Sequence, residues 1–314
     1  MSELVNQAKT TEDRGHLTTE KRLDASSELD TLSTEGMLHV MNGEDAKIAA
    51  AVEKAVPAIA GLVDSIVERM KRGGRIMYIG AGTSGRLGVL DASEIPPTFQ
   101  ADPSMVVGII AGGDGALRKS SESKEDVYDG SYEALDELGV NGDDVMIGIA
   151  AGGTTPYVWG ALEYVKKKGG VTGFVSCVEL GEIEKRFGVA VDHKIELIVG
   201  PEVVTGSTRM KSGTVTKLAL NMISTITMVK LGKVWGNLMV DVKATNAKLV
   251  DRAVRMLMGQ TELEREDAAK LLEKADGHVK VALVMQKKGI NAEEARSLLT
   301  KYEGVLHPIL GRPR

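Results

Sequence analysis

The residues with the clearest chemical potential form a short turn rich in glycine and hydroxyl groups. The apolar run 76–79 ends at this turn, whose sequence at 80–85 is Gly-Ala-Gly-Thr-Ser-Gly, and an apolar helical pattern follows it. A helix that begins directly after a strand points unpaired backbone N–H groups, and their partial positive charge, at any ligand above the strand end. The residues expected to hold an anion here are Gly82, Thr83, Ser84 and Gly85.

Local chemistry leaves three interpretations of this turn. Glycine is needed at many strand–helix turns whether or not they bind a ligand. The spacing also fits the dinucleotide fingerprint G-x-G-x-x-G, which requires an acidic residue after the next strand to hold a ribose. The run 105–110 ends instead in Ala-Gly-Gly, so the ribose ligand is missing. The paired hydroxyls favour a phosphomonoester, and a turn without a ligand stays open beside it.

The elements that must position this turn are read from the apolar pattern. Five apolar, β-branched runs alternate with helical patterns near 85–93, 115–138, 156–168 and 181–187. This alternation predicts an α/β fold with a doubly wound, five-stranded parallel sheet. The expected strands are Arg75–Ile79, Met105–Ile110, Val145–Ala150, Val171–Cys177 and Lys194–Val199.

Ligands of such sheets bind at the carboxyl ends of the strands. The loops 80–85, 111–115, 151–156 and 200–208 are therefore expected to converge, and two more of them are rich in hydroxyls. Three such turns favour a phosphosugar-type anion site over three simple helix caps. The further residues expected to bind the anion are Gly153, Thr154, Thr155, Ser207 and Thr208.

The flanking regions predict a division into three parts: a tail and arm at 1–43, a phosphosugar-binding domain at 44–245, and a helical domain at 246–314. Within the first part, 1–17 is expected to be a loose tail, and a short capped helix is expected around 33–41. Helical spacing continues over 44–72, with Pro57 as a possible break. A further long helix is expected over 207–231, and Thr261 and Asn291 are expected N-caps in the C-terminal part.

Composition limits the classes of partner. The chain has 314 residues, a net charge of −5 and 4% aromatic residues, which argues against nucleic acid as the main partner. No apolar stretch approaches the roughly 18 residues of a membrane helix, and the polar N-terminus is unlike a signal peptide. The single cysteine, Cys177, lies in an apolar run and is expected to be buried, and the five histidines lack metal-ligand spacing. A cytoplasmic protein is expected.

Four longer segments resemble one known family, the N-acetylmuramic acid 6-phosphate etherases. They are IGAGTSGRLGVLDASEIPPTF (79–99), GIIAGGDGAL (108–117), GPEVVTGSTRMKSGT (200–214) and LGKVWGNLMVDVKATNAKL (231–249). The resemblance runs from about Thr18 to about Leu299. It implies the sugar-isomerase (SIS) fold with a small C-terminal helical domain, and a homodimer.

The implied reaction belongs to bacterial cell-wall recycling. The lactyl ether of N-acetylmuramic acid 6-phosphate is cleaved to N-acetylglucosamine 6-phosphate and D-lactate. Opening the sugar ring makes the C2 proton acidic, a carboxylate base removes it, and a general acid protonates the departing lactate before water adds at C3. Two carboxylates with separated pKa values can run this cycle without a metal or a cofactor.

The resemblance also implies roles for particular residues. Glu94, in the D-A-S-E motif, is the implied acid for the lactate and base for the water, and Glu125 is the implied C2 base. On residue type alone, Glu122 and Asp126 suit the second role equally well. Phosphate contacts are implied for Thr83, Ser84, Gly85, Ser207 and Thr208. Glu202 is a candidate for orienting a sugar hydroxyl or assisting ring opening, with a purely structural role an equal expectation.

The second loop departs from the family pattern. Family members usually read A-A-S-G-R-T-P, whereas this chain has Gly152 and Thr154 in place of the serine and the arginine. The loss predicts weaker phosphate binding or a changed substrate preference. A non-catalytic phosphosugar sensor and an aldose–ketose isomerase are the alternatives within this fold. The presence of both Glu94 and Glu125 favours the enzyme over the sensor.

Overall fold

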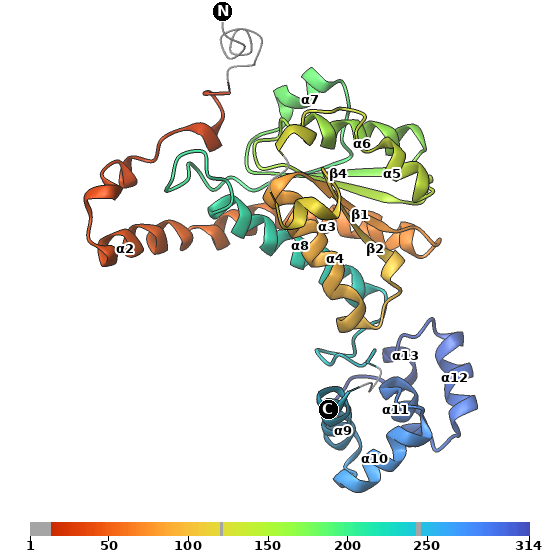
Figure 1. Cartoon of the computed structure of the whole chain (residues 1–314). Coiled ribbons are helices and arrows are strands. Elements are labelled where there is room, and N and C mark those ends of the chain that lie inside the picture. Colours follow the sequence, from red (N-terminus) through yellow and green to blue (C-terminus); the bar gives the residue numbers. More distant parts are fainter. Residues whose placement is uncertain (1–13, 120–121, 243–245) are drawn as a thin grey trace, which may run out of the picture.

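The computed structural model describes residues 14–119, 122–242 and 246–314, and its centre is one parallel sheet of five strands (Figure 1). The strand order is β2-β1-β3-β4-β5, so the sheet is doubly wound, as predicted, and its switch point lies between β1 and β3. Gly80 pairs with both Ile110 and Ile149, which brings the ends of the three strands to one level. The strands are β1 Ile76–Gly80, β2 Val106–Ile110, β3 Val145–Ile149, β4 Val171–Ser176 and β5 His193–Glu196.

Helices cover both faces of the sheet (Figure 1). Helices α3, α4 and α8 pack on one face, where α3 and α4 both contact α8. Helices α5, α6 and α7 cover the other face (Figure 1). The ring centroid of Trp159 on α6 lies 4.8 Å from that of Phe174 on β4, with the two rings tilted. Their bounds are α3 Ile48–Met70, α4 Gly82–Phe99, α5 Tyr132–Glu137, α6 Pro156–Lys167, α7 Gly181–Phe187 and α8 Lys211–Lys230.

The helical patterns were predicted with mixed accuracy. The pattern over 44–72 is interrupted at 46–47, between α2 (Thr34–Asp45) and α3, whereas Pro57 lies inside α3 without ending it. Burial of the apolar stripe of α3 offsets the hydrogen bond that this proline cannot donate. Most of the stretch expected to be helical at 115–138 forms short turns, because it is polar and rich in serine, aspartate and glycine. Those turns are the 3-10 helices Asp114–Leu117 and Glu122–Lys124, and another, Pro103–Met105, precedes β2.

The N-terminal arm reaches away from the sheet. Three 3-10 turns, at Thr18–Glu20, Asp24–Ser26 and Leu29–Thr31, precede α2. Ser33 caps α2 by accepting a hydrogen bond from the N–H of Gly36 at 3.1 Å, and α2 then projects from the body of the molecule (Figure 1). Residues 1–13 of the tail predicted at 1–17 lie outside the described residues. Its last residue, Leu17, is buried in the core.

The C-terminal helices surround an apolar core of their own. Asn291 caps α12 in a capping box with Glu294, as predicted. The N-cap predicted at Thr261 is wrong: Thr261 ends α9, and its hydroxyl donates to the carbonyl of Leu257. Across the described residues, no helix combines the length and apolar character needed to span a bilayer. The helices are α9 Ala247–Thr261, α10 Arg265–Lys274, α11 Val279–Lys288, α12 Ala292–Lys301 and α13 His307–Leu310.

Candidate active site

A cavity of about 250 Å³ opens at the carboxyl ends of β1 and β3. Three predicted turns contribute to its wall: 81–84 after β1, 149–152 with Thr154 and Thr155 at the end of β3, and Gly206 with Thr208 after β5. Because β1 and β3 flank the switch point, this is the place where an open α/β sheet binds its ligand. We call it the strand-end cavity.

The first turn is shaped by glycines that leave no space for a side chain. A Cβ atom on Gly80 would lie 2.8 Å from the backbone nitrogen of Gly85, and one on Gly85 would lie 2.6 Å from a side-chain carbon of Ile110. Gly82 has a φ of 52°, which favours glycine. No side chain caps the first turn of α4, so its backbone N–H groups can join the hydroxyls of Thr83 and Ser84 in binding an anion.

The second turn positions Glu125. Helix α6 begins at Pro156 without a side-chain cap, and the N–H of Tyr157 donates to the backbone carbonyl of Glu125 at 3.0 Å. The indole N–H of Trp159 donates to the carbonyl of Gly153 at 2.7 Å, which links the turn to α6. The 122–130 segment is thereby held at the start of α6, where Glu125 lines the strand-end cavity beside Thr155.

The third turn is held by a buried carboxylate. Glu202 is fully buried and accepts hydrogen bonds from the backbone N–H groups of Lys211 at 3.0 Å and Ser212 at 2.8 Å. It therefore caps α8, which begins at Lys211, four residues later than the sequence pattern predicted. The ammonium of Lys211 pairs with Glu44 at 2.5 Å in the interior, which ties this turn to α2. Both oxygens of Glu202 are engaged in the cap, and Glu202 does not line the strand-end cavity.

The N-terminal arm closes one side of the cavity, which the sequence patterns did not indicate. Arg14, Leu17, Thr19 and Glu20 all line it. The hydroxyl of Thr19 is buried without a hydrogen-bond partner, 3.7 Å from where a Cβ on Gly152 would lie. Among the described residues of the cavity wall, Arg14 alone is cationic. It stands in a polar stretch without periodicity, so no local signal connected it to the turns.

The structure brings seven of the predicted site residues together and leaves others outside. Gly85, Gly153 and Ser207 belong to the same turns but do not line the cavity. Residues 112–114 of the 111–115 loop line a different hollow together with Lys124. That loop follows β2, the edge strand, which displaces it from the switch point. The seven that line the cavity are Gly82, Thr83, Ser84, Glu125, Thr154, Thr155 and Thr208.

Glu94 lies elsewhere in the same chain. It is exposed on α4 and lines a separate cleft of about 130 Å³ between α4 and α8, together with Asp91 and Lys217. At a rise of about 1.5 Å per residue, Glu94 is roughly 16 Å along the helix axis from Thr83. Within one chain, Glu94 and Glu125 therefore do not line one cavity.

The cleft contains a carboxyl group with an unusual affinity for protons. Asp91 is buried and accepts hydrogen bonds from the hydroxyls of Tyr78 at 3.0 Å and Ser224 at 3.1 Å. Burial raises the pKa of Asp91 from 3.8 to about 6, although both hydrogen bonds lower it. Cys177, which lies outside this cleft, is buried as the sequence predicted, and burial raises the pKa of its thiol to about 12.

Comparison with known sequences gives close relatives over nearly the whole chain. It is 49% identical to an N-acetylmuramic acid 6-phosphate etherase of Photorhabdus laumondii over 95% of this chain and 98% of that protein. An etherase of the same name from Picosynechococcus sp. is 50% identical over the same shares. One from Lactobacillus acidophilus is 48% identical, over 94% of this chain and 98% of that protein.

Two further comparisons concern the sheet region. Residues 58–166 match the family model described as the glucokinase regulatory protein N-terminal SIS domain. Among solved structures, the chain is similar to phosphoheptose isomerase GmhA from Neisseria gonorrhoeae, with 14% identity and a TM-score of 0.46, over 62% of this chain and 98% of that one.

Proposed function

The chain belongs to the N-acetylmuramic acid 6-phosphate etherases, and from that premise we propose what its cavities and carboxylates do. It is an enzyme that cleaves a carbon–oxygen ether bond, with N-acetylmuramic acid 6-phosphate as substrate and D-lactate and N-acetylglucosamine 6-phosphate as products. The observation that carries the site assignment is the convergence of three hydroxyl-rich turns with Glu125 in the strand-end cavity.

The phosphate of the substrate binds at the first turn. The uncapped start of α4 supplies backbone N–H groups and positive potential, and Thr83 and Ser84 supply hydroxyls. Thr154, Thr155 and Thr208 line the same wall. Arg14 supplies a guanidinium in a cavity whose second turn has threonine where the family pattern has arginine, and Thr19 places a hydroxyl beside Gly152, where that pattern has serine.

Glu125 is the base for the C2 proton. In the ring-opened sugar, the C1 aldehyde acidifies this proton, and Glu125 lines the cavity that would hold the sugar. The bond electrons form the C1–C2 enol and then expel the C3 oxygen, which a general acid protonates as lactate leaves. Water adds to C3 of the resulting unsaturated aldehyde, and the acid, now ionised, takes the proton from that water. Glu125, protonated in the first step, returns its proton to C2, so both carboxyl groups regain their starting states.

Glu94 is the general acid and acts on the substrate of a second copy of the chain. It is too far along α4 to serve the cavity of its own chain, whereas its surroundings have the character of an interface. Leu90, one turn before it, is 49% exposed, and Ile226 on the neighbouring α8 is 46% exposed. A homodimer that buries this apolar face would carry Glu94 toward the partner's cavity.

The projecting arm supports the same assembly. Helix α2 extends from the body of the molecule and exposes Leu38 to 60% (Figure 1). This helix of the arm therefore has exposed apolar surface to bury against a partner. We place this homodimer in the cytoplasm. The single cysteine is buried and forms no disulfide, which suits a compartment that keeps thiols reduced.

The test is to incubate the purified protein with N-acetylmuramic acid 6-phosphate and to assay D-lactate. Wild type should release lactate, and Glu94→Gln should release none while still binding N-acetylglucosamine 6-phosphate. Glu53→Gln, an exposed glutamate on α3, is the matched control and should behave as wild type. Absence of lactate from folded wild type would contradict the reaction. Normal turnover by Glu94→Gln would contradict only the assignment of the acid.

A further inference from the structure

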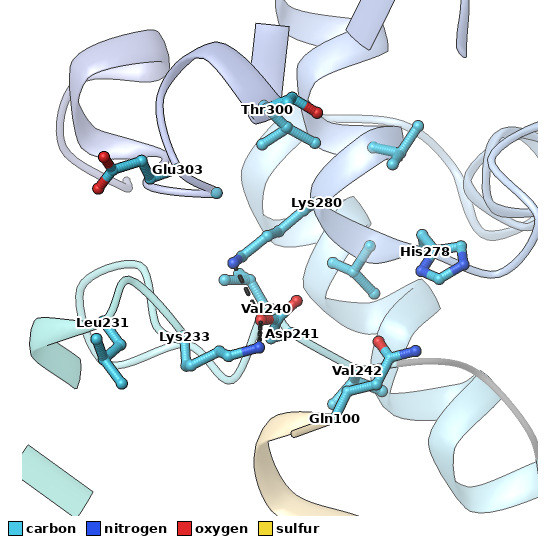
Figure 2. Close-up of a pocket in the computed structure, with 14 residues that line it drawn as sticks. Gln100, Leu231, Lys233, Val240, Asp241, Val242, His278, Lys280, Thr300 and Glu303 are labelled. Carbon is cyan, nitrogen blue, oxygen red and sulfur yellow. Dashed lines mark ion pairs between the residues drawn. The ribbon is translucent and has the colours of Figure 1, made fainter. Parts of the chain in front are cut away.

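A second cavity, of about 420 Å³, lies where the sheet region meets the C-terminal helices, and the proposed reaction does not use it (Figure 2). Its wall combines the segment 231–242 after α8, Gln100 at the end of α4, the first turn of α11 and the end of α12. We call it the junction cavity. It is independent of the strand-end cavity, with which it shares no residue.

Two lysines share one carboxylate oxygen in this cavity (Figure 2). The ammonium of Lys233 lies 2.9 Å from Oδ2 of Asp241, and the ammonium of Lys280 lies 3.2 Å from the same atom. The side chain of Lys280 is only 10% exposed, and its ammonium also donates to the carbonyl of Gly232 at 2.9 Å. Two ammonium groups and one carboxylate leave this cluster with a net charge of +1.

The surroundings add to this positive charge. Lys280 lies in the first turn of α11, where the helix dipole already disfavours a cation and where no side chain caps the helix. Glu303 also lines the junction cavity, but in Figure 2 its carboxylate points away from the two ammonium groups. Burial lowers the pKa of Lys280 while Asp241 raises it, so a further negative charge beside this ammonium would stabilise its charged form.

We propose that the junction cavity binds a small organic anion whose carboxylate or phosphate group pairs with Lys233 and Lys280. An ammonium pair that shares one carboxylate favours an added oxyanion, which completes the charge balance of the cluster. The remainder of the wall suits a carbon skeleton, because it includes apolar side chains such as Val240 and Leu299. The ligand would contact the segment after α8 and helices α11 and α12 together.

The experiment isolates this site by silencing the strand-end cavity with Ser84→Asp, whose added negative charge opposes phosphate there. The thermal unfolding midpoint of this variant is measured against inorganic phosphate and, separately, D-lactate, with chloride at matched ionic strength as the baseline. A ligand that binds only the folded protein raises the midpoint in a saturable way. The anion that raises the midpoint at the lower concentration is the preferred oxyanion.

Adding Lys280→Met to the Ser84→Asp variant should weaken its apparent affinity for the anion by about tenfold or more, the loss expected for a charge-assisted hydrogen bond. Lys233→Met, a less buried position, should do the same and serves if Lys280→Met fails to fold. Lys274→Met, an exposed lysine of α10, is the matched control and should keep the midpoint rise. The proposal is overturned if neither anion acts beyond chloride, or if the rise survives in both cavity variants.

Discussion

Arg14 shows how one residue outside every recognised motif can complete an anion site. It is the single cation among the described residues of the strand-end cavity, whose other polar groups are hydroxyls and two glutamates. A phosphate dianion beside Glu125 needs positive charge, and the backbone N–H groups of α4 supply only part of it. The arm therefore lines the cavity in which we propose that the phosphate binds.

Arg14→Gln should raise the KM for N-acetylmuramic acid 6-phosphate by about tenfold or more, with a smaller effect on kcat, because the contact exists before and during the reaction. Arg14→Lys should retain part of the affinity, since it keeps the charge. Steady-state lactate release measures both constants. Arg22→Gln, an exposed arginine that does not line the cavity, is the control. An unchanged KM for Arg14→Gln would show that the phosphate is held without it.

Asp91 is the residue whose protonation should be visible in stability. Its pKa is about 6 in the folded protein and about 3.8 when exposed, so the folded state binds this proton more tightly than the unfolded chain. The resulting stabilisation is complete below about pH 3.8 and is lost as the pH rises through about 6. A shift of this size corresponds to about 3 kcal/mol of unfolding free energy.

Asp91→Asn removes this titration while keeping an acceptor for the hydroxyl of Tyr78. The unfolding free energy of the variant minus that of wild type should therefore rise by about 3 kcal/mol from about pH 3 to pH 7. Urea unfolding at several pH values measures this difference. The exposed Asp30→Asn is the control and should give a flat profile. A flat profile for Asp91→Asn would mean that Asp91 titrates normally.

At the scale of elements, the third turn is positioned by the start of α8. Glu202 accepts two backbone N–H groups there, and Lys211 links the same helix end to Glu44 of α2. Glu202→Gln should destabilise the fold by about 2 kcal/mol, because one N–H would face an amide donor and the charge at the helix N-terminus would be lost. Chemical denaturation measures this, with Glu53→Gln as the exposed control. A variant as stable as wild type would contradict the capping role.

The strands and most sheet-flanking helices could be predicted because their signals are local. Runs of apolar β-branched residues overlap all five strands, although β5 ends at Glu196 and the run was predicted to continue to Val199, and α7 has the predicted bounds. The capped helix of the arm was predicted, whereas the turns within 115–138 and the position of residues 14–20 beside the cavity were not, since these depend on long-range contacts. The N–H of Tyr157 meeting the carbonyl of Glu125 is one such contact, and the burial of Leu17 is another. The separation of Glu94 from Glu125 is likewise a property of the assembled fold.

At the scale of the whole molecule, the three-part division at residues 43 and 245 stays a prediction. The C-terminal helices have their own core, and the junction cavity lies between them and the sheet region. Exposed apolar residues lie elsewhere: Leu38 is on the arm, Leu90 lines the cleft that contains Glu94, and Ile226 is on α8. They support the proposed homodimer, in which each catalytic site would take its base from one chain and its acid from the other.

Activity of a defined heterodimer tests this claim most directly. Glu94→Gln and Ser84→Asp chains are co-expressed with different affinity tags, and the dimer carrying both tags is isolated. Each homodimeric parent should be inactive. In the heterodimer, one site combines the intact turn of the Glu94→Gln chain with the intact Glu94 of its partner, so lactate release should reach about half of the wild-type rate. A heterodimer as inactive as its parents, or tags that never co-purify, would contradict the shared site.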